Sequence, residues 1–477
     1  MVLRVFNTLT KKKEVFKPIR KEEVRMYTCG PTVYSTPHLG NYRSFLMGDL
    51  IRRYLEHIGY RVKYVMNITD IDDKTIRDSG KEGLSLKKFT EKYVKEFFKG
   101  VDMLNIKRAL NYPRATEHVQ DMINITRELA RKGYAYTKSG SVYFDISKFK
   151  DYGKLSKIIL SETKAGARVD VDEYDKDNPR DFALLKRTTP EELRRRIYYK
   201  TEWGNVRPGW HIECSTLAMK FLGESLDIHT GGVDLIFPHH ENEIAQSEAY
   251  TGKDFVKYWM HGEHLLVNGR KMSKSLGNYI TLEDVIKRFS PEVVRYMFLS
   301  AHYRKKLNYT EEFAANAKRN YDKLKETFGR INFFMKHADT KKAESEKAFL
   351  NELATIEKRF IKAMDDDLNT PLALRVFHEL AKEINGYLQR RRNKDALKTA
   401  LQIFKRFSEV FGLKFKDEEK ELHLQIEELI KQREEARKRK DWETADAIRD
   451  KLRRMGVTLK DTPVGVRWTI EKDDIIP

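Results

Sequence analysis

The apolar residues of the first hundred positions follow two different periods. Residues 24–29 form a short apolar run that ends at Gly30-Pro31, and residues 61–66 alternate between apolar and polar side chains. Both patterns predict strands. Between them, apolar residues recur with helical spacing from position 45 to position 55. A strand, a helix and a strand in this order form a βαβ unit, which predicts a parallel sheet.

The middle of the chain interrupts this pattern. Residues 118–136 predict one amphipathic helix, and residues 174–200 are polar and predict an irregular stretch. A strand-like pattern resumes near Trp210, and residues 226–232 (LDIHTGG) predict a strand that runs into a glycine turn. We therefore expect a two-part α/β domain that an insertion of roughly 80–90 residues divides, a size within the ordinary range for domains.

The last third of the chain has a helical period. Strand patterns disappear after about residue 310, and helical spacing continues to about residue 440. The tail, GVTLKDTPVGVRWTIEKD, has the turn residues and alternation of a small hairpin. The predicted fold is therefore α/β, a Rossmann-like parallel sheet with an insertion, followed by a helical domain and a small C-terminal α+β element.

Composition and charge narrow the class of protein. A chain of 477 residues suggests about three domains, and 40% hydrophobic residues suffice for packed cores. Two cysteines exclude a disulfide-stapled secreted scaffold, and neither a signal peptide nor an apolar run of about 20 residues is present. We expect a cytoplasmic protein with no membrane partner. Its 92 Lys and Arg against 72 Asp and Glu give a net charge of +20, which favours nucleic acid as a partner over a generically solvated surface.

Two segments have the chemistry of phosphate binding. Residues 37–41 (PHLGN) follow a predicted strand and open a predicted helix, where backbone N–H groups and the helix dipole favour an anion. Residues 271–275 (KMSKS) place Lys271 and Lys274 among small hydroxyl residues, and two such point charges can embrace a polyphosphate. Taken singly, the first segment could be a helix start with an incidental histidine, and the second a solvated basic loop.

A third set of residues has the chemistry of zinc ligands. Cys29, Cys214, His239 and Glu243 offer two thiolates, one imidazole and one carboxylate. His239 and Glu243 are four positions apart, which places them on one face of a helix. A lone cysteine is more often a small buried hydrophobe than a ligand.

The two phosphate-binding segments together resemble the signature sequences of class I aminoacyl-tRNA synthetases. Both cysteines lie in segments, TCGPTVY and GWHIECS, that resemble the cysteinyl-tRNA synthetase family, as does FPHHENEIAQSEA. The resemblance covers nearly the whole chain, with further matches at residues 67–74, 181–186, 207–215, 271–278, 364–374 and 436–452.

This resemblance implies a complete set of site residues. Cys29, Cys214, His239 and Glu243 would hold one zinc ion that binds the substrate cysteine through its sulfur. The remaining residues would divide between the amino acid and the nucleotide: Gly30, Thr69, Trp210 and His229 would line the cysteine pocket; His38, Gly40, Asn41, Asp234 and Lys274 would contact ATP; and His38, Asn41, Lys271 and Lys274 would act in catalysis. The implied partners are L-cysteine, tRNA(Cys) and ATP with Mg²⁺.

The resemblance also implies a division of the chain. Residues 1–115 and 203–265 would be the two halves of a Rossmann-like catalytic domain, and residues 116–202 the inserted domain. Residues 266–320 would carry the lysine loop and contact the tRNA stem. Residues 321–415 would form a helical anticodon-binding domain, and residues 416–477 a C-terminal anticodon-binding region, where Trp442 and Trp468 could stack on unpaired bases.

The sequence departs from the family pattern at two places, and two alternative functions stay open. Class I enzymes more often end the first signature in histidine where this chain has Asn41, and residues 188–206 are longer and more basic than the family suggests. One alternative is a related ligase that joins cysteine to an amino sugar, which would lack the C-terminal region. The other is a non-catalytic RNA-binding protein with a structural zinc, which would not need the lysine loop.

Overall fold

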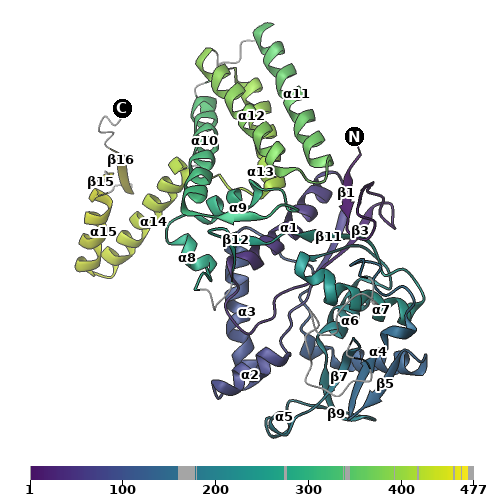
Figure 1. Cartoon of the computed structure of the whole chain (residues 1–477). Coiled ribbons are helices and arrows are strands. Elements are labelled where there is room, and N and C mark those ends of the chain that lie inside the picture. The colour runs from purple at the N-terminus through teal and green to yellow at the C-terminus, as the bar shows by residue number, and fades with distance from the viewer. Residues whose placement is uncertain are drawn as a thin grey trace.

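The computed structural model describes residues 2–158, 178, 180–272, 277–336, 338, 344–390, 393–415, 418–454, 457–462 and 465–470. The chain has three visible parts (Figure 1): a central α/β region, a second sheet below it, and a helical bundle above it. Helices α14 and α15 stand beside the bundle with the C-terminal hairpin.

A four-stranded parallel sheet forms the centre of the α/β region, with the strand order β11-β10-β3-β4. The strands are β3 (Glu23–Thr28), β4 (Arg61–Met66), β10 (Leu226–Gly232) and β11 (Val256–Gly262). Helix α1 (Leu39–His57) connects β3 to β4, and α7 (Glu241–Thr251) connects β10 to β11. The two βαβ halves therefore meet between β3 and β10, which pair in parallel through Ile228 with Met26 and Thr230 with Thr28. The predicted parallel sheet is confirmed.

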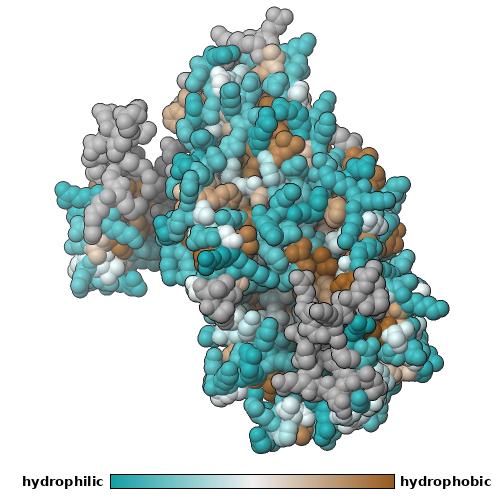
Figure 2. Space-filling view, in the orientation of Figure 1, coloured by the Kyte–Doolittle hydropathy of each residue, from teal (hydrophilic) through white to brown (hydrophobic). Residues whose placement is uncertain are grey.

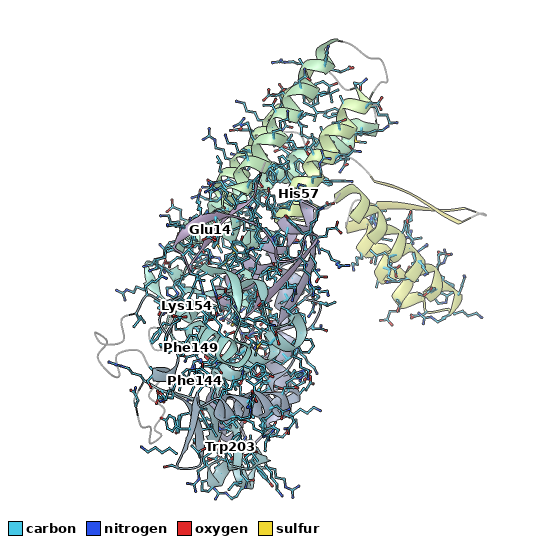
Figure 3. The ribbon with its side chains drawn as sticks, turned by 90° about the vertical axis from the view of Figure 1, so that its right-hand side faces the viewer. Glu14, His57, Phe144, Phe149, Lys154 and Trp203 are labelled. Atoms are coloured by element: carbon cyan, nitrogen blue, oxygen red, sulfur yellow. The ribbon has the colours of Figure 1, made fainter. Side chains whose placement is uncertain are left out.

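The insertion forms a sheet of its own. Strands β5 (Ala135–Lys138), β6 (Ser141–Phe144), β7 (Phe182–Arg187), β9 (Gly204–Pro208) and β8 (Tyr199–Thr201) pair in that order, and every pairing is antiparallel. Figure 3 labels Phe144, Phe149 and Trp203 in this lower part of the molecule. Short helix α5 (Pro190–Arg194) lies between β7 and β8, and α4 (Val119–Arg131) precedes the sheet. Strand β9 continues this sheet six residues beyond the expected boundary at residue 202.

Three local predictions in this region are wrong. The helix predicted over residues 118–136 ends at Arg131, because Gly133 turns the chain with a φ of +80° before β5 begins. Residues 174–200 are not irregular throughout, since β7, α5 and the start of β8 lie within them. The residues from Trp210 onward form helix α6 (Trp210–Leu222) and not a strand. This helix is buried along most of its length, so its sequence lacks an amphipathic period.

Smaller elements extend the α/β region. Strands β1 (Arg4–Asn7) and β2 (Lys12–Val15) form an N-terminal hairpin, and α2 (Asp73–Lys81) and α3 (Leu86–Met103) follow β4. Strands β13 (Arg270–Lys271), β12 (Leu265–Val267) and β14 (Leu307–Tyr309) form a three-stranded sheet. Helices α8 (Leu282–Ile286) and α9 (Pro291–Leu299) lie between β13 and β14 along the chain.

The helical prediction for the last third of the chain is confirmed. The bundle contains α10 (Glu311–Lys336), α11 (Glu344–Asp365), α12 (Thr370–Arg390) and α13 (Lys394–Phe411). It shares one hydrophobic core with α1 and α9 of the α/β region, and His57 at the end of α1 marks this junction in Figure 3. Helices α14 (Glu418–Lys438) and α15 (Trp442–Arg454) then lead to the predicted hairpin of β15 (Val457–Thr462) and β16 (Gly465–Ile470).

A buried ion pair joins these two parts. The Asp49 carboxylate of α1 pairs with the guanidinium groups of Arg53 and Arg295, and Arg295 also donates to the carbonyl oxygens of Leu104 and Phe411. Figure 2 shows that the described residues on the face turned toward the viewer are mostly hydrophilic. No helix among those residues has the length and apolarity needed to cross a membrane.

Candidate metal centre and nucleotide cleft

The candidate site lies at the carboxyl ends of the central parallel strands. Cys29 follows β3, Thr69 follows β4, and Asp234 follows β10. In an open parallel sheet, ligands bind where the strand order reverses, which here is the junction of β3 and β10. A cavity of about 370 Å³ opens at this point, and its walls include Cys29, Thr69, Asp234 and Lys271. Topology therefore brings together residues that the sequence separates by more than two hundred positions.

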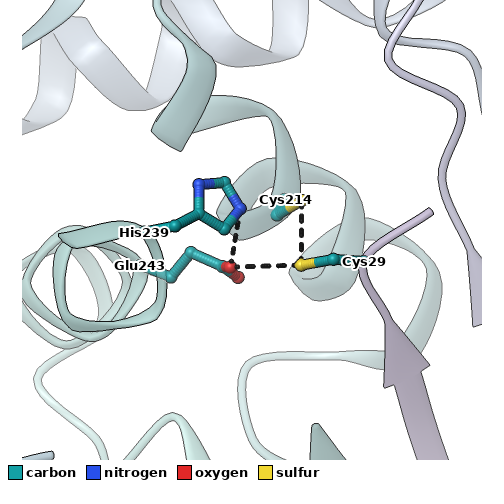
Figure 4. Close-up of side chains that lie close together, drawn as sticks. All are labelled: Cys29, Cys214, His239 and Glu243. Carbon is teal, nitrogen blue, oxygen red and sulfur yellow. Dashed lines mark hydrogen bonds and ion pairs between the residues drawn. The ribbon is translucent and has the colours of Figure 1, made fainter. Parts of the chain in front are cut away.

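The side chains of the four predicted zinc ligands lie close together (Figure 4), and three of them, Cys29, Cys214 and His239, line this cavity. The Sγ atoms of Cys29 and Cys214 are 3.6 Å apart, and Cys29 Sγ lies 3.6 Å from Glu243 Oε1. His239 Nε2 lies 3.1 Å from the same carboxylate oxygen. Cys29 directly follows β3, and Cys214 belongs to α6. His239 lies in the short helical segment Ile236–His240 that leads into α7, and Glu243 lies in the first turn of α7. The predicted i, i+4 pairing of His239 with Glu243 is confirmed.

The donor set fits a tetrahedral metal ion. Zinc bonds of ~2.3 Å to sulfur and ~2.0 Å to nitrogen or oxygen place tetrahedral ligands about 3.3–3.8 Å apart. The three separations of 3.6, 3.6 and 3.1 Å lie at or near that range. All four donor atoms lie within 4.8 Å of one another. Two sulfurs, one imidazole nitrogen and one carboxylate oxygen are donors that suit a borderline-soft divalent ion.

The electrostatics of these groups also suit a cation. Burial raises the pKa of Cys214, but the hydrogen bond from Cys29 and the charge of His239 lower it to about 6. Burial lowers the pKa of His239, but Cys214 and Glu243 raise it to about 10. The pKa of Glu243 falls to about 2 because His229 and His239 outweigh its burial. The pKa of Cys29 is raised by burial and by Cys214. Without a metal, the site therefore holds two negative groups, Cys214 and Glu243. Cys29 and His239 carry protons that a metal ion would displace.

Further histidines surround this centre, and sequence reasoning missed three of them: His211, His240 and His261. His211 Nδ1 lies 3.0 Å from His239 Nδ1, which leaves His239 Nε2 on the side of Glu243. His240 Nε2 lies 3.3 Å from Cys29 Sγ, and its Nδ1 lies 2.7 Å from His261 Nε2. Cys29, His229, His240 and Glu243 form a second group whose donor atoms also lie within 4.8 Å. Position alone could have suggested His240, because it is adjacent to His239.

Three of the four residues predicted to bind cysteine line the cavity. They are Gly30, Thr69 and Trp210, and the Trp210 ring stacks on His239 at 4.2 Å between centroids. His229 is fully buried and lies behind Glu243, with its Nε2 2.9 Å from Oε2 of that carboxylate. The structure therefore places His229 against a candidate metal ligand and not on the cavity wall.

The first signature forms the start of helix α1. His38 is the N-cap residue: its Nδ1 accepts from the Asn41 backbone N–H, and its own N–H donates to Asn41 Oδ1. Since His38 Nδ1 is an acceptor, the neutral ring carries its proton on Nε2, as a hydrogen-bond donor. A Cβ atom on Gly40 would lie 3.0 Å from the His38 ring, so a larger residue would crowd it. His38, Gly40, Asn41 and Asp234 all line the cavity.

The second signature lies only partly within the described residues. Lys271 is exposed at the end of β13 and belongs to the cavity lining. The side-chain amide of Asn278 donates a hydrogen bond to the Lys271 carbonyl oxygen at 3.1 Å. This bond links residues on either side of the lysine loop. Lys274 lies outside the described residues.

The parallel sheet, the helix start at residues 37–41 after its first strand and the lysine that lines its cleft have the arrangement expected of a class I aminoacyl-tRNA synthetase. The family model described as "tRNA synthetases class I (C) catalytic domain" matches residues 15–319. Models for the DALR domain and for the cysteinyl-tRNA ligase anticodon binding domain match residues 359–416 and 419–468. The chain belongs to the cysteine–tRNA ligase family, which confirms the resemblance drawn from its motifs.

Full-length relatives agree with these matches. A cysteine–tRNA ligase of Methanosarcina mazei is 56% identical over 97% of this chain and 98% of its own length. One from Thermococcus onnurineus is 49% identical over 98% of this chain and 99% of its own length. A third, from Geobacillus thermodenitrificans, is 46% identical over 98% of both chains.

Solved structures share the fold at low sequence identity. A structure described as a putative arginyl-tRNA synthetase of Campylobacter jejuni superposes with a TM-score of 0.58 at 15% identity, covering 84% of this chain and 95% of that one. A methionyl-tRNA synthetase of Mycobacterium tuberculosis gives a TM-score of 0.56 at 15% identity, covering 82% of this chain and 90% of that one. These likenesses show that the chain shares its fold with these two synthetases.

Proposed function

We propose that this enzyme joins L-cysteine to tRNA(Cys) in two steps, through a cysteinyl-adenylate. ATP and cysteine first give the adenylate and pyrophosphate, and the cysteinyl group then moves to the 3′ end of the tRNA. One observation carries the proposal: Cys29, Cys214 and His239 open onto the same cavity as His38 and Lys271. An amino acid held by its sulfur at one end would present its carboxylate toward a nucleotide at the other.

The ion at this centre would be zinc, held by Cys29, Cys214, His239 and Glu243. We favour this set over the one with His229 and His240 because Cys29, Cys214 and His239 line the cavity, whereas His229 and His240 are not part of its lining. When bound, zinc would supply a coordination site for the substrate thiolate and would favour it over the neutral hydroxyl of serine. A pocket that relies on shape separates such similar side chains by only about 10²-fold. The metal set would therefore provide the selectivity.

The protein residues at the nucleotide end would position ATP and stabilise charge. Adenylate formation is an attack of the substrate carboxylate on the α-phosphorus, so no protein nucleophile is required. His38 would donate from Nε2 to a phosphate oxygen, and Lys271 and Lys274 would stabilise the charge that develops on the phosphates. Gly40, Asn41 and Asp234 would complete the ATP site, with Mg²⁺ accompanying the nucleotide.

The C-terminal half would bind the tRNA. The run from residue 431 to residue 454 is rich in Lys and Arg, and Trp442 at the start of α15 is 58% exposed. An exposed aromatic ring among cations is suited to stack on an unpaired base. The side chain of Trp468, the other predicted stacking residue, lies outside the described residues. The expected domain boundaries, the tRNA-stem role of residues 266–320 and the cytoplasmic location stay predictions.

The decisive experiment is to charge total tRNA with each amino acid in turn, alongside amino-acid-dependent ATP–pyrophosphate exchange. Cysteine alone should support both reactions, and only tRNA(Cys) should become charged. Exchange without tRNA charging, combined with transfer to an amino sugar, would favour the amino-sugar ligase. The absence of cysteine-dependent exchange from a folded, zinc-loaded protein would favour the non-catalytic alternative.

A further inference from the structure

Helix α3 carries exposed lysines to which the proposed reaction assigns no role. They are separated by four, three and four positions, and this spacing places all of them on one face of the helix. All four side chains are exposed, and together they are called the lysine stripe: Lys88, Lys92, Lys95 and Lys99. Another face of α3 is buried through Phe89 and Phe97. The helix therefore packs on one side and presents a row of positive charges on the other.

The lysine stripe differs from an ordinary solvated helix face. Such a face mixes charges of both signs, because residues three or four positions apart form ion pairs. Within the described part of the chain, only Lys99 of the four pairs with a carboxylate, that of Glu283 at 2.6 Å. The acidic residues of α3 have other partners: Glu91 pairs with Arg114, Glu96 accepts from Thr36, and Asp102 pairs with Arg108. Like charges at these spacings destabilise a helix, and a polyanion bound to them would remove that repulsion.

The stripe passes beside the cavity that the proposed reaction uses. Glu96, which follows Lys95, accepts a hydrogen bond from Thr36 Oγ1 at 2.7 Å, and Thr36 lines that cavity. Lys99 then contacts Glu283 in α8, the helix that follows the lysine loop along the chain. An RNA whose 3′ end enters the cavity therefore has its adjoining segment close to α3.

The other end of the stripe borders the inserted domain. Lys87, next to Lys88, lines a second cavity of about 760 Å³ together with Arg195 and Arg196. Both arginines belong to the basic segment 188–206, which departs from the family pattern. Acidic side chains also occur in this lining, so the unbroken row of positive charge belongs to the stripe.

We propose that the lysine stripe binds the phosphate backbone of the tRNA acceptor arm. This inference rests on the proposed function, because it takes tRNA(Cys) as the second substrate. Lysines act on phosphates as point charges and hold an RNA without reading its sequence. From Lys88 to Lys99 the stripe spans roughly 16 Å at about 1.5 Å per residue, enough to meet several successive phosphates. The stripe thus holds the arm whose 3′ end enters the cavity.

The test measures how the affinity for tRNA(Cys) depends on salt. The variant replaces Lys88, Lys92 and Lys95 with glutamine and leaves Lys99 in its ion pair. Each phosphate contact on a duplex adds about 0.9 to the slope of log affinity against log salt concentration. Loss of three contacts should lower that slope by up to about 2.7. The affinity deficit of the variant should then shrink by up to about 40-fold between 50 and 200 mM salt.

Two RNA fragments locate the contact on the tRNA. A hairpin with the acceptor and T stems, but no anticodon arm, should lose as much affinity for the triple variant as full-length tRNA does. A hairpin of the anticodon arm should bind the variant and the wild type equally. A variant that weakens the anticodon hairpin, or full-length tRNA alone, would place the stripe on another part of the RNA and overturn the proposal.

Thermal unfolding separates a binding role from a structural one. Because the lysines repel one another, the triple variant should melt at the same temperature as the wild type or higher. A structural role predicts a lower melting temperature. Lys92→Gln alone, in the middle of the stripe, keeps the proposal testable if the triple variant folds poorly, and should lower the slope by up to about 0.9.

The control removes the same charge elsewhere, by replacing Lys132, Lys220 and Lys253 with glutamine. These lysines belong to or follow α4, α6 and α7, which lie to the right of α3 in Figure 1. Lys220 and Lys253 pair with Asp121 and Glu224. The control should keep the wild-type slope. The proposal is overturned if the triple stripe variant lowers the slope by less than one phosphate contact, or if the control lowers it equally. A wild-type protein that binds no tRNA(Cys) would instead refute the proposed function.

Discussion

Replacing Gly30 with alanine should empty the metal centre without unfolding the protein. Gly30 directly follows the candidate ligand Cys29, and its N–H donates to the Asn67 side chain. A Cβ atom at this position would lie 1.7 Å from the Asn67 carbonyl oxygen and 2.8 Å from its carbonyl carbon. Both of these atoms belong to the backbone after β4, so the clash cannot be relieved by rotating a side chain.

The magnitude follows from the separations in the site. Ordinary contact between a carbon and an oxygen atom needs about 3.4 Å, so the backbone at residue 30 or residue 67 must move by at least about 1.5 Å. The Sγ atoms of Cys29 and Cys214 are 3.6 Å apart, and a zinc site tolerates bond-length changes of only about 0.2 Å. A 1 Å displacement near reacting groups costs about 10²-fold in rate. We expect Gly30→Ala to lose most of its zinc and to activate cysteine at least about 100-fold more slowly.

The assay measures metal content by elemental analysis, cysteine-dependent ATP–pyrophosphate exchange and thermal unfolding. Gly386→Ala is the matched control, because Gly386 lies within helix α12 and a Cβ atom there would meet no atom within 4 Å. That variant should keep its zinc and its activity, and should gain about 0.5–1 kcal/mol of stability. A Gly30→Ala protein with a full complement of zinc and near-normal exchange would refute the reasoning.

Four further predictions follow from the same centre and from the second half of the chain. Glu243→Gln should lower zinc content and the preference for cysteine over serine together, which elemental analysis and exchange rates with both amino acids would show; an unchanged preference would contradict the role of the metal. Zinc affinity, measured by competition with a chelator, should fall up to about 100-fold per pH unit as the pH drops from 8 to 7, because Cys29 and His239 both carry protons in the metal-free site and must release them; a flat profile would exclude these ligands. Lys274→Ala should slow exchange at least about 100-fold while circular dichroism stays unchanged, and a normal rate would remove this lysine from the mechanism. Deleting the residues beyond 415 should weaken tRNA binding and flatten its salt dependence but spare exchange, whose proposed residues all lie upstream; a folded truncation without exchange activity would contradict this division.

The candidate metal ligands, which the structure brings together, could be predicted from the sequence because their chemistry is rare and local. The chain has only two cysteines, and the i, i+4 spacing of His239 and Glu243 is a helical signal that needs no tertiary information. The parallel sheet could also be predicted from the sequence, because the residues of β3, α1 and β4 show strand, helix and strand patterns in this order. In both cases the local pattern and the final structure agree.

The remaining parts depend on contacts that the sequence does not show. Helix α6 is buried on most sides, so its sequence has no amphipathic period. Its N-cap residue is Gly209, which has no side chain and therefore gives no capping signal in the sequence. For these two reasons the sequence near Trp210 favours a strand over a helix. Strand β8 has only three residues and is paired on one side by β9. Glu213 and His240 acquire their neighbours only when β3 and β4 meet α6 and α7. Periodicity predicts elements, but not which buried polar groups will face each other.

The junction of β3 and β10 also has a consequence for the order of synthesis. Cys29 and Cys214 are 185 positions apart, and the complete inserted sheet lies between them. At ribosomal speeds of about 5–20 residues per second, the first thiol leaves the ribosome roughly 10–40 seconds before the last ligand, Glu243, has been made. During this interval β3 has no β10 to pair with, and Cys29 has no neighbouring donors. Binding of the proposed metal would therefore be a late event in the life of each newly made chain, because it requires that both halves of the sheet have paired.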